Sequence, residues 1–112
     1  MSKEILIENI KKKHKEDDVV KILSDIVKHL IFSDFGYIKT LGAEEIYKYL
    51  IKLCIDVTDL EVLDTEKDYD DFFDKVLNEK INDINSSGLE GQIDFIIMGG
   101  ISAENIELMI SI

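Results

Sequence analysis

The residues best suited to chemistry in this sequence are carboxylates gathered in the middle of the chain. Between residues 56 and 74 only Lys67 opposes nine acids, which are Asp56, Asp59, Glu61, Asp64, Glu66, Asp68, Asp70, Asp71 and Asp74. Apolar residues recur there at helical spacing, which predicts that Glu66, Asp70 and Asp74 stack on the outer face of a helix. Two interpretations stay open: a solvated helix face, or a surface complementary to a basic protein.

Part of the same stretch has the spacing of a calcium-binding loop. Four acids fall at the first, third, fifth and seventh positions of an EF-hand-like loop: Asp64, Glu66, Asp68 and Asp70. However, Tyr69 stands where glycine makes the sharp turn, and Lys75 stands where a bidentate glutamate closes the ligand shell. We therefore expect no metal site and no cofactor.

Other features that suggest catalysis fit it poorly, and we expect no enzyme activity. Cys54 lies on the apolar stripe of a predicted helix, which favours an ordinary buried cysteine over a nucleophile paired with His29. Residues 95–106 look like the strand, Gly-Gly turn and helix that grip phosphate in some (β/α)₈ barrel enzymes. A barrel needs about 200 residues, and Glu104 and Glu107 would repel a phosphate, so we interpret the glycines as a turn.

The overall charge restricts the partners that the chain can attract. The sequence holds 24 acidic residues and 13 basic ones, for a formal charge of −11. All of the basic residues are lysine, so arginine, the usual bidentate ligand of phosphate and guanine, is absent. Such a charge repels nucleic acid and anionic membranes and accelerates encounters with a basic protein.

Hydrophobic spacing predicts a mainly α fold with four helices around one core. Proline is absent, and apolar residues recur mostly three and four positions apart. The predicted helices cover residues 2–13, residues 17 or 18 to about 33–36, residues 42–56, and a segment capped by Thr65 that ends at 86–88. A short extended stretch is expected at residues 37–39.

The C-terminal tail has two possible structures. Ile93, Phe95 and Ile97 alternate as a strand does, and so do the apolar residues from Ile106 to the end, which favours a β-hairpin and an α+β fold. The alternative is a strand, a turn at the two glycines that follow Met98, and a helix capped by Ser102.

The chain has the size and composition of a single cytoplasmic domain. Its 112 residues, 46% of them hydrophobic, suffice for one core, and we predict one domain over residues 1–112. No stretch is apolar enough to span a bilayer, and acids occur where a signal peptide would be apolar. The single cysteine fits a reducing compartment.

In size, acidity and lack of catalytic motifs the chain resembles the small immunity proteins that bacteria make against their own antibacterial toxins. This resemblance implies an inhibitor that covers a basic nuclease toxin. The candidate contact residues are Asp59, Glu61, Asp64, Glu66, Asp70, Asp71 and Asp74. The alternative is a small regulatory or adaptor module that dimerises, or binds a partner, through its apolar C-terminal segment.

Overall fold

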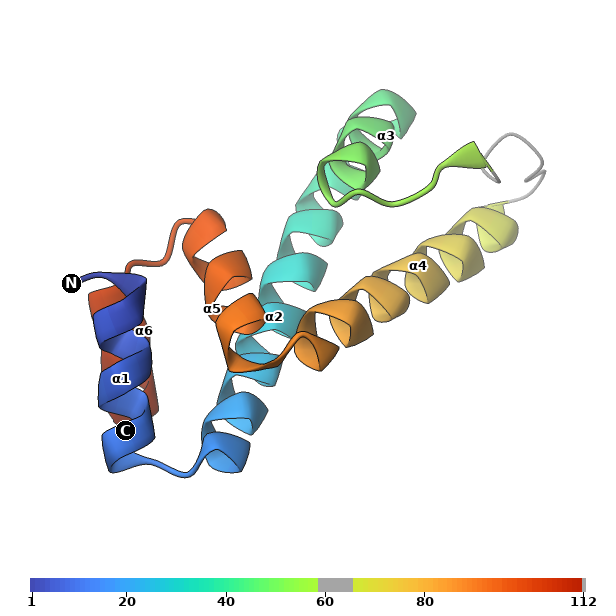
Figure 1. Cartoon of the computed structure of the whole chain (residues 1–112). Helices are drawn as coiled ribbons and strands as arrows, with labels where there is room; N and C mark the ends of the chain where they lie inside the picture. The colour runs from blue at the N-terminus through green and yellow to red at the C-terminus, as the bar shows by residue number, and fades with distance from the viewer. Residues whose placement is uncertain (59–65, 112) are drawn as a thin grey trace. The chain divides into compact units, whose positions relative to one another are not determined.

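The computed structural model describes residues 1–58 and 66–111, of which 83% are helical. Six helices follow one another along the chain (Figure 1). They are α1 (Lys3–Lys13), α2 (Glu16–Lys39), α3 (Ala43–Lys52), α4 (Glu66–Ser86), α5 (Gly88–Met98) and α6 (Ala103–Ser111). No strand occurs in these described residues.

The prediction of four helices with a C-terminal β-hairpin is wrong. The segment expected to be the first strand lies in α5, and Ile106, Leu108 and Ile110 lie in α6. Isoleucines in both segments also occur three and four positions apart, and this spacing buries Ile93 with Ile96 and Ile106 with Ile110. The alternative prediction for the tail was right about the helix after Ser102, whose hydroxyl accepts a hydrogen bond from the Asn105 backbone N–H at 3.3 Å, but wrong about the strand before it.

The two glycines after Met98 do form a turn, but it joins two helices. Gly100 has φ +98°, a left-handed conformation that an L-residue with a side chain rarely adopts. The Gly99 N–H donates to the Phe95 carbonyl and ends α5. The chain can therefore turn sharply and start α6 within four residues of Gly99.

The other helix predictions were closer. Helix α1 begins after Ser2, whose hydroxyl accepts from the Ile5 N–H at 3.2 Å, and it ends at Lys13 as predicted. The extended stretch predicted at residues 37–39 is wrong, because α2 continues to Lys39. Phe35 continues the buried stripe of Val27 and Ile31 into residues 33–36, where we expected the helix to stop.

The described chain divides into two compact units. Unit 1 comprises residues 1–30 and 83–112, and unit 2 comprises residues 31–82. Helices α2 and α4 each contribute residues to both units. The prediction of a single domain over residues 1–112 stays a prediction.

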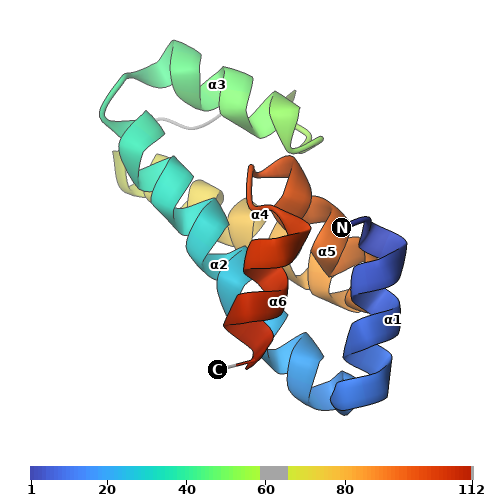
Figure 2. The same cartoon turned by 90° about the vertical axis from the view of Figure 1, so that its left-hand side faces the viewer.

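Unit 1 is built on contacts between helices that are distant in the sequence. Helix α1 packs against α5 and α6, and α1 and α6 run side by side in the same direction (Figures 1 and 2). The fully buried apolar side chains of this unit are Leu6, Val19, Leu23, Val27, Ile93, Ile96 and Ile106. Gln92 is buried among them, and its Nε2 donates to the Val20 carbonyl at 3.2 Å and to Ser24 Oγ at 3.0 Å.

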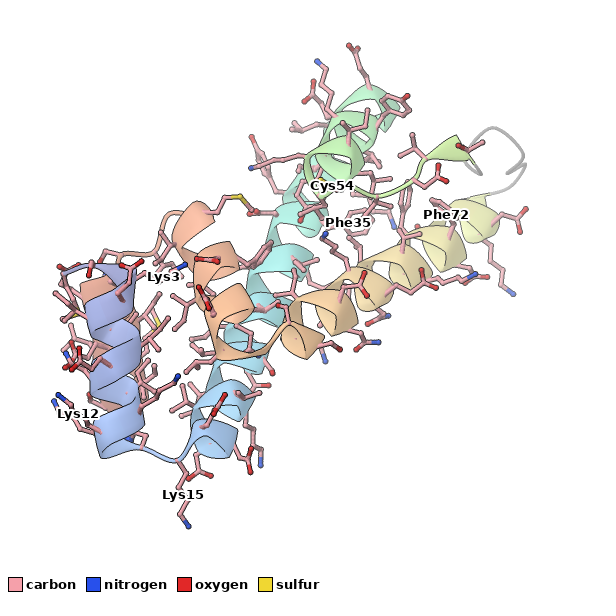
Figure 3. The ribbon with its side chains drawn as sticks, viewed as in Figure 1. Lys3, Lys12, Lys15, Phe35, Cys54 and Phe72 are labelled. Carbon is pink, nitrogen blue, oxygen red and sulfur yellow. The ribbon has the colours of Figure 1, made fainter. Side chains whose placement is uncertain are left out.

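Ion pairs join the ends of the chain within unit 1. The N-terminal ammonium lies 2.6 Å from Glu104 on α6, and Lys3 lies 2.8 Å from Asp94 on α5. Figure 3 shows Lys3 reaching from α1 towards α5. The hydrogen bond to Asp94 raises the pKa of Lys3, and the hydrogen bond from the N-terminal ammonium lowers the pKa of Glu104.

Unit 2 has an aromatic core. The rings of Phe35 on α2 and Phe73 on α4 pack with centroids 5.3 Å apart at 53° (Figure 3 labels Phe35). Tyr49 on α3 is buried and donates its hydroxyl to the Ile31 carbonyl of α2 at 3.0 Å. These contacts hold the inner face of α3 and the start of α4 against α2.

Candidate protein-binding surface

Helix α4 contains three of the predicted contact residues, Asp70, Asp71 and Asp74, whose side chains the structure describes. Its buried stripe is Phe73, Leu77, Ile81 and Ile84, at intervals of four, four and three residues. Because this stripe packs against the core, Asp71 and Asp74 lie outside it and face solvent, and both are exposed. We call these two residues the α4 acidic face.

The α4 acidic face is not neutralised by the chain itself. Among the described residues, no ion pair involves the carboxylate of Asp71 or Asp74. The backbone carbonyl of Asp74 accepts a hydrogen bond from Asn78 Nδ2 at 2.7 Å. Both negative charges are therefore open to a cation from outside.

Asp70 behaves differently from its two neighbours. Its carboxylate forms an ion pair with Lys39 at the end of α2, and its side chain is 43% exposed. The pair cancels one negative charge of the predicted stack of Glu66, Asp70 and Asp74. Asp70 therefore fastens α4 to α2, and it offers a partner less charge than Asp71 or Asp74 does.

The remaining predicted contact residues are only partly described. Glu66 is the first residue of α4. Asp59, Glu61 and Asp64 lie outside the described residues. Asp56, which precedes them, is exposed and accepts hydrogen bonds from the Thr58 hydroxyl at 2.6 Å and the Thr58 N–H at 2.9 Å, which lower its pKa.

The structure also places the other residues that the sequence singled out. From Glu66 onwards the calcium-like spacing falls on α4, so these positions follow a helix instead of a coordinating loop. Within the described ranges, no group of three or more His, Cys, Asp or Glu side chains is arranged to hold a metal ion.

Cys54 contradicts the expectation that it is a buried core residue. It follows the end of α3, has φ +58° and is exposed, and Figure 3 marks its position there. Helix α3 ends at Lys52, so the apolar stripe on which we placed Cys54 does not extend to it. His29 is also exposed, on α2.

Sequence reasoning missed a set of exposed apolar side chains. In the described part of unit 2, the exposed large hydrophobic residues all fall between positions 37 and 51: Tyr37, Leu41, Tyr47 and Ile51. Tyr47 and Ile51 lie one turn apart on α3, away from the buried Ile46 and Leu50, whereas Tyr37 lies near the end of α2 and Leu41 lies in the turn that follows. An apolar pair at helical spacing outside the core stripe, such as Tyr47 and Ile51, was the signal that could have revealed part of this set.

The C-terminal segment is less available than predicted. Ile106 and Ile110 are buried in unit 1, whereas Leu108 is 65% exposed. The segment thus contributes to the core of its own unit and presents a single strongly exposed leucine. It is not the free apolar strand that the adaptor hypothesis assumed.

Comparisons with known proteins add no relative to these observations. No family model matches the chain, and no curated protein or solved structure is found to be similar to it. None of the helices in the described ranges is both long enough and apolar enough to cross a bilayer.

Proposed function

We propose that this protein is a protein-binding inhibitor, an immunity protein that neutralises a basic nuclease toxin through its acidic surface. The observation that supports it most directly is the α4 acidic face, where Asp71 and Asp74 are exposed without an ion pair to the chain's own lysines. Nucleases present lysine and arginine to phosphates, and these groups attract carboxylates held in fixed positions.

The charge of unit 2 supports the same proposal. Residues 31–82 contain 13 acids and six lysines, a formal charge of −7, whereas unit 1 has a charge of −4. A field of this sign accelerates the approach of a basic protein and opposes direct nucleic-acid binding. The proposed setting is the cytoplasm, which keeps the exposed thiol of Cys54 reduced.

The test is inhibition of the toxin-like product of a neighbouring gene, measured as nuclease activity and as association rate. Reversing both charges of the face, with Asp71→Lys and Asp74→Lys, should slow association at least about tenfold at low salt. The fold should be unaffected, because both side chains are exposed.

A matched control separates the face from net charge. Glu4→Lys with Asp25→Lys changes the charge equally, and both of these residues are exposed in unit 1 and lie outside α4. Compared at the same salt concentration, we expect the control to alter association less than about threefold, since charges outside a contact are largely screened. Equal effects of the two double variants would contradict a role for α4, and a wild-type protein that leaves the nuclease active would overturn the proposal.

The second candidate is a regulatory or adaptor module that dimerises, or binds a partner, through the C-terminal segment. Leu108 favours it, because a leucine that is 65% exposed is unpaired within its own unit. Deleting the segment would not test it cleanly, since Ile106 and Ile110 belong to the core. Leu108→Ser with Met109→Ser removes the exposed apolar side chains of the described segment and leaves its buried isoleucines in place, and binding or dimerisation that survives this change argues against the adaptor role.

A further inference from the structure

In the described part of unit 2, four large apolar residues near the turn between α2 and α3 are exposed. Tyr37 is 68% exposed, Leu41 50%, Tyr47 47% and Ile51 51%. We call these four residues the corner surface, because they flank the turn between α2 and α3. Single exposed apolar residues are ordinary, but two pairs within 15 residues of sequence, half of them tyrosine, are typical of interfaces.

Local hydrogen bonds hold the two pairs close together. The Thr40 N–H donates to the Tyr37 carbonyl at 3.1 Å, the Leu41 N–H donates to the Ile38 carbonyl at 2.9 Å, and Gly42 then reverses the chain with φ +108°. The short connection keeps the Cα atoms of Leu41 and Tyr47 within about 14 Å of each other. A single helix of about 10–12 Å diameter is wide enough to touch both pairs.

Helix α3 packs against α2 through one side, and the described residues leave another side of it exposed. Ile46 and Leu50 are buried, and the hydrogen bond from Tyr49 to the Ile31 carbonyl fixes α3 on α2. Tyr47 and Ile51, one turn apart, therefore lie on a part of α3 that this unit does not cover.

An ion pair connects the start of α4 to the end of α2. Lys39, which lies between Tyr37 and Leu41 in the sequence, pairs with Asp70. Asp71 follows Asp70 directly and Asp74 lies one turn beyond Asp70, so the α4 acidic face starts one residue after this ion pair.

Resting on the proposed function, we propose that the corner surface is the docking site for a basic amphipathic helix of the partner. Apolar side chains of that helix would cover the four residues of the corner surface. Its lysines or arginines would form ion pairs with Asp71 and Asp74. Charge argues against the other occupants. A second copy would bring together two units of −7, and an anionic membrane would repel the same carboxylates.

The probe is a synthetic peptide of about 18 residues, five helical turns, made of leucine and lysine with all leucines on one helical face. A second peptide has the same composition in an order that leaves no apolar face. Binding of both to the full chain is measured by fluorescence anisotropy at low and high salt. We expect the amphipathic peptide to bind at least about tenfold more tightly than the scrambled one.

Two double variants separate the apolar contribution of the corner surface from the electrostatic contribution of the α4 acidic face. Tyr47→Ser with Ile51→Ser should weaken the amphipathic peptide about tenfold and leave the scrambled peptide unchanged, whereas Asp71→Lys with Asp74→Lys should weaken both. The matched apolar control is Ile5→Ser with Leu108→Ser, which removes exposed side chains from unit 1 and should change neither affinity. Circular dichroism checks that each variant keeps its helical content.

Each outcome decides between the docking site and the acidic surface. If Tyr47→Ser with Ile51→Ser leaves the affinity for the amphipathic peptide unchanged, the docking site is overturned. The proposed function is still supported in that case if Asp71→Lys with Asp74→Lys weakens peptide binding in a salt-dependent way. If the charge variant binds both peptides normally, the acidic mechanism fails. If neither peptide binds the wild-type chain, the docking site is overturned and the nuclease assay alone decides the function.

Discussion

The two units use their charged side chains in opposite ways. In unit 1, ion pairs join positions far apart in the sequence: the N-terminal ammonium meets Glu104, and Lys3 meets Glu90 and Asp94. In the described part of unit 2, the ion pair between Lys39 and Asp70 joins two helices, and the pairs of Lys48 lie within α3. The pairs of unit 1 connect α1 to α5 and α6, whereas Asp71 and Asp74 of unit 2 are exposed and form no ion pair with another described residue.

The cores of the two units also differ in composition. Unit 1 buries a polar amide, Gln92, among aliphatic side chains, while unit 2 is centred on the rings of Phe35 and Phe73. Unit 2 also exposes the corner surface. Unit 1 exposes large apolar side chains as well, among them Met98 at 68% and Leu108 at 65%, so exposure alone does not separate the units. We assign the binding role to unit 2 because its charge is −7 against −4 for unit 1.

The largest expected effect tests whether the units are separate at all. Ile93→Ala in unit 1 and Phe73→Ala in unit 2 each remove a buried side chain and should lower the free energy of unfolding by about 2–5 kcal/mol. Because α2 and α4 contribute to both units, we expect urea denaturation to show one transition in each variant. Hydrogen exchange would detect the contrary result, in which each variant loosens only the amides of its own unit.

A smaller effect is expected from the buried amide of unit 1. Gln92 Nε2 donates to Val20, Ser24 and Asn85, while its Oε1 is buried without a hydrogen-bond partner. Gln92→Leu keeps similar volume but removes these hydrogen bonds, and it should lower the free energy of unfolding by about 1–3 kcal/mol, measured by urea denaturation. A more stable variant would show that the unpaired oxygen outweighs the three hydrogen bonds.

Among the described residues of unit 2, Tyr49 makes a buried side-chain hydrogen bond, and we expect its loss to cost less than that of Gln92. Tyr49→Phe removes the hydroxyl that donates to the Ile31 carbonyl and should cost about 1 kcal/mol. Burial raises the pKa of Tyr49, and the nearby Asp34 adds to the shift. The protonated phenol is favoured by folding, so this contribution is present below the ordinary pKa of 10.0 and is lost as pH rises above it.

Absorbance during alkaline titration checks the assignment. Because burial raises its pKa, Tyr49 should ionise only as the protein unfolds. This late step should be missing in Tyr49→Phe. If it persists in the variant, another tyrosine is responsible.

The smallest effect concerns the ion pair that anchors the N-terminus. The hydrogen bond from the N-terminal ammonium lowers the pKa of Glu104, so its contribution is present above the ordinary value of 4.5 and is lost as pH falls below it. Glu104→Gln should lower the melting temperature slightly at neutral pH and not at all at strongly acid pH. Glu4→Gln, an exposed acid of α1, is the control and should show no such pH dependence.

Part of this structure follows from local sequence alone. Helix α1 ends at Lys13 as predicted, and the absence of proline agrees with a mainly helical chain. The end of α4 at Ser86 was also predictable, because Ser87 and Gly88 interrupt the apolar pattern. Such signals are reliable because capping and helical spacing involve residues only a few positions apart.

Only the tertiary structure decided the form of the tail. Isoleucines such as Ile93, Ile96, Ile106 and Ile110 satisfy both the strand and the helix pattern, and packing of α6 beside α1 favours the helix. The same holds for charge: position in the sequence does not distinguish Asp70, paired with Lys39, from Asp71, which is exposed. Burial and pairing depend on residues brought together from distant parts of the chain, and local spacing contains no information about those partners.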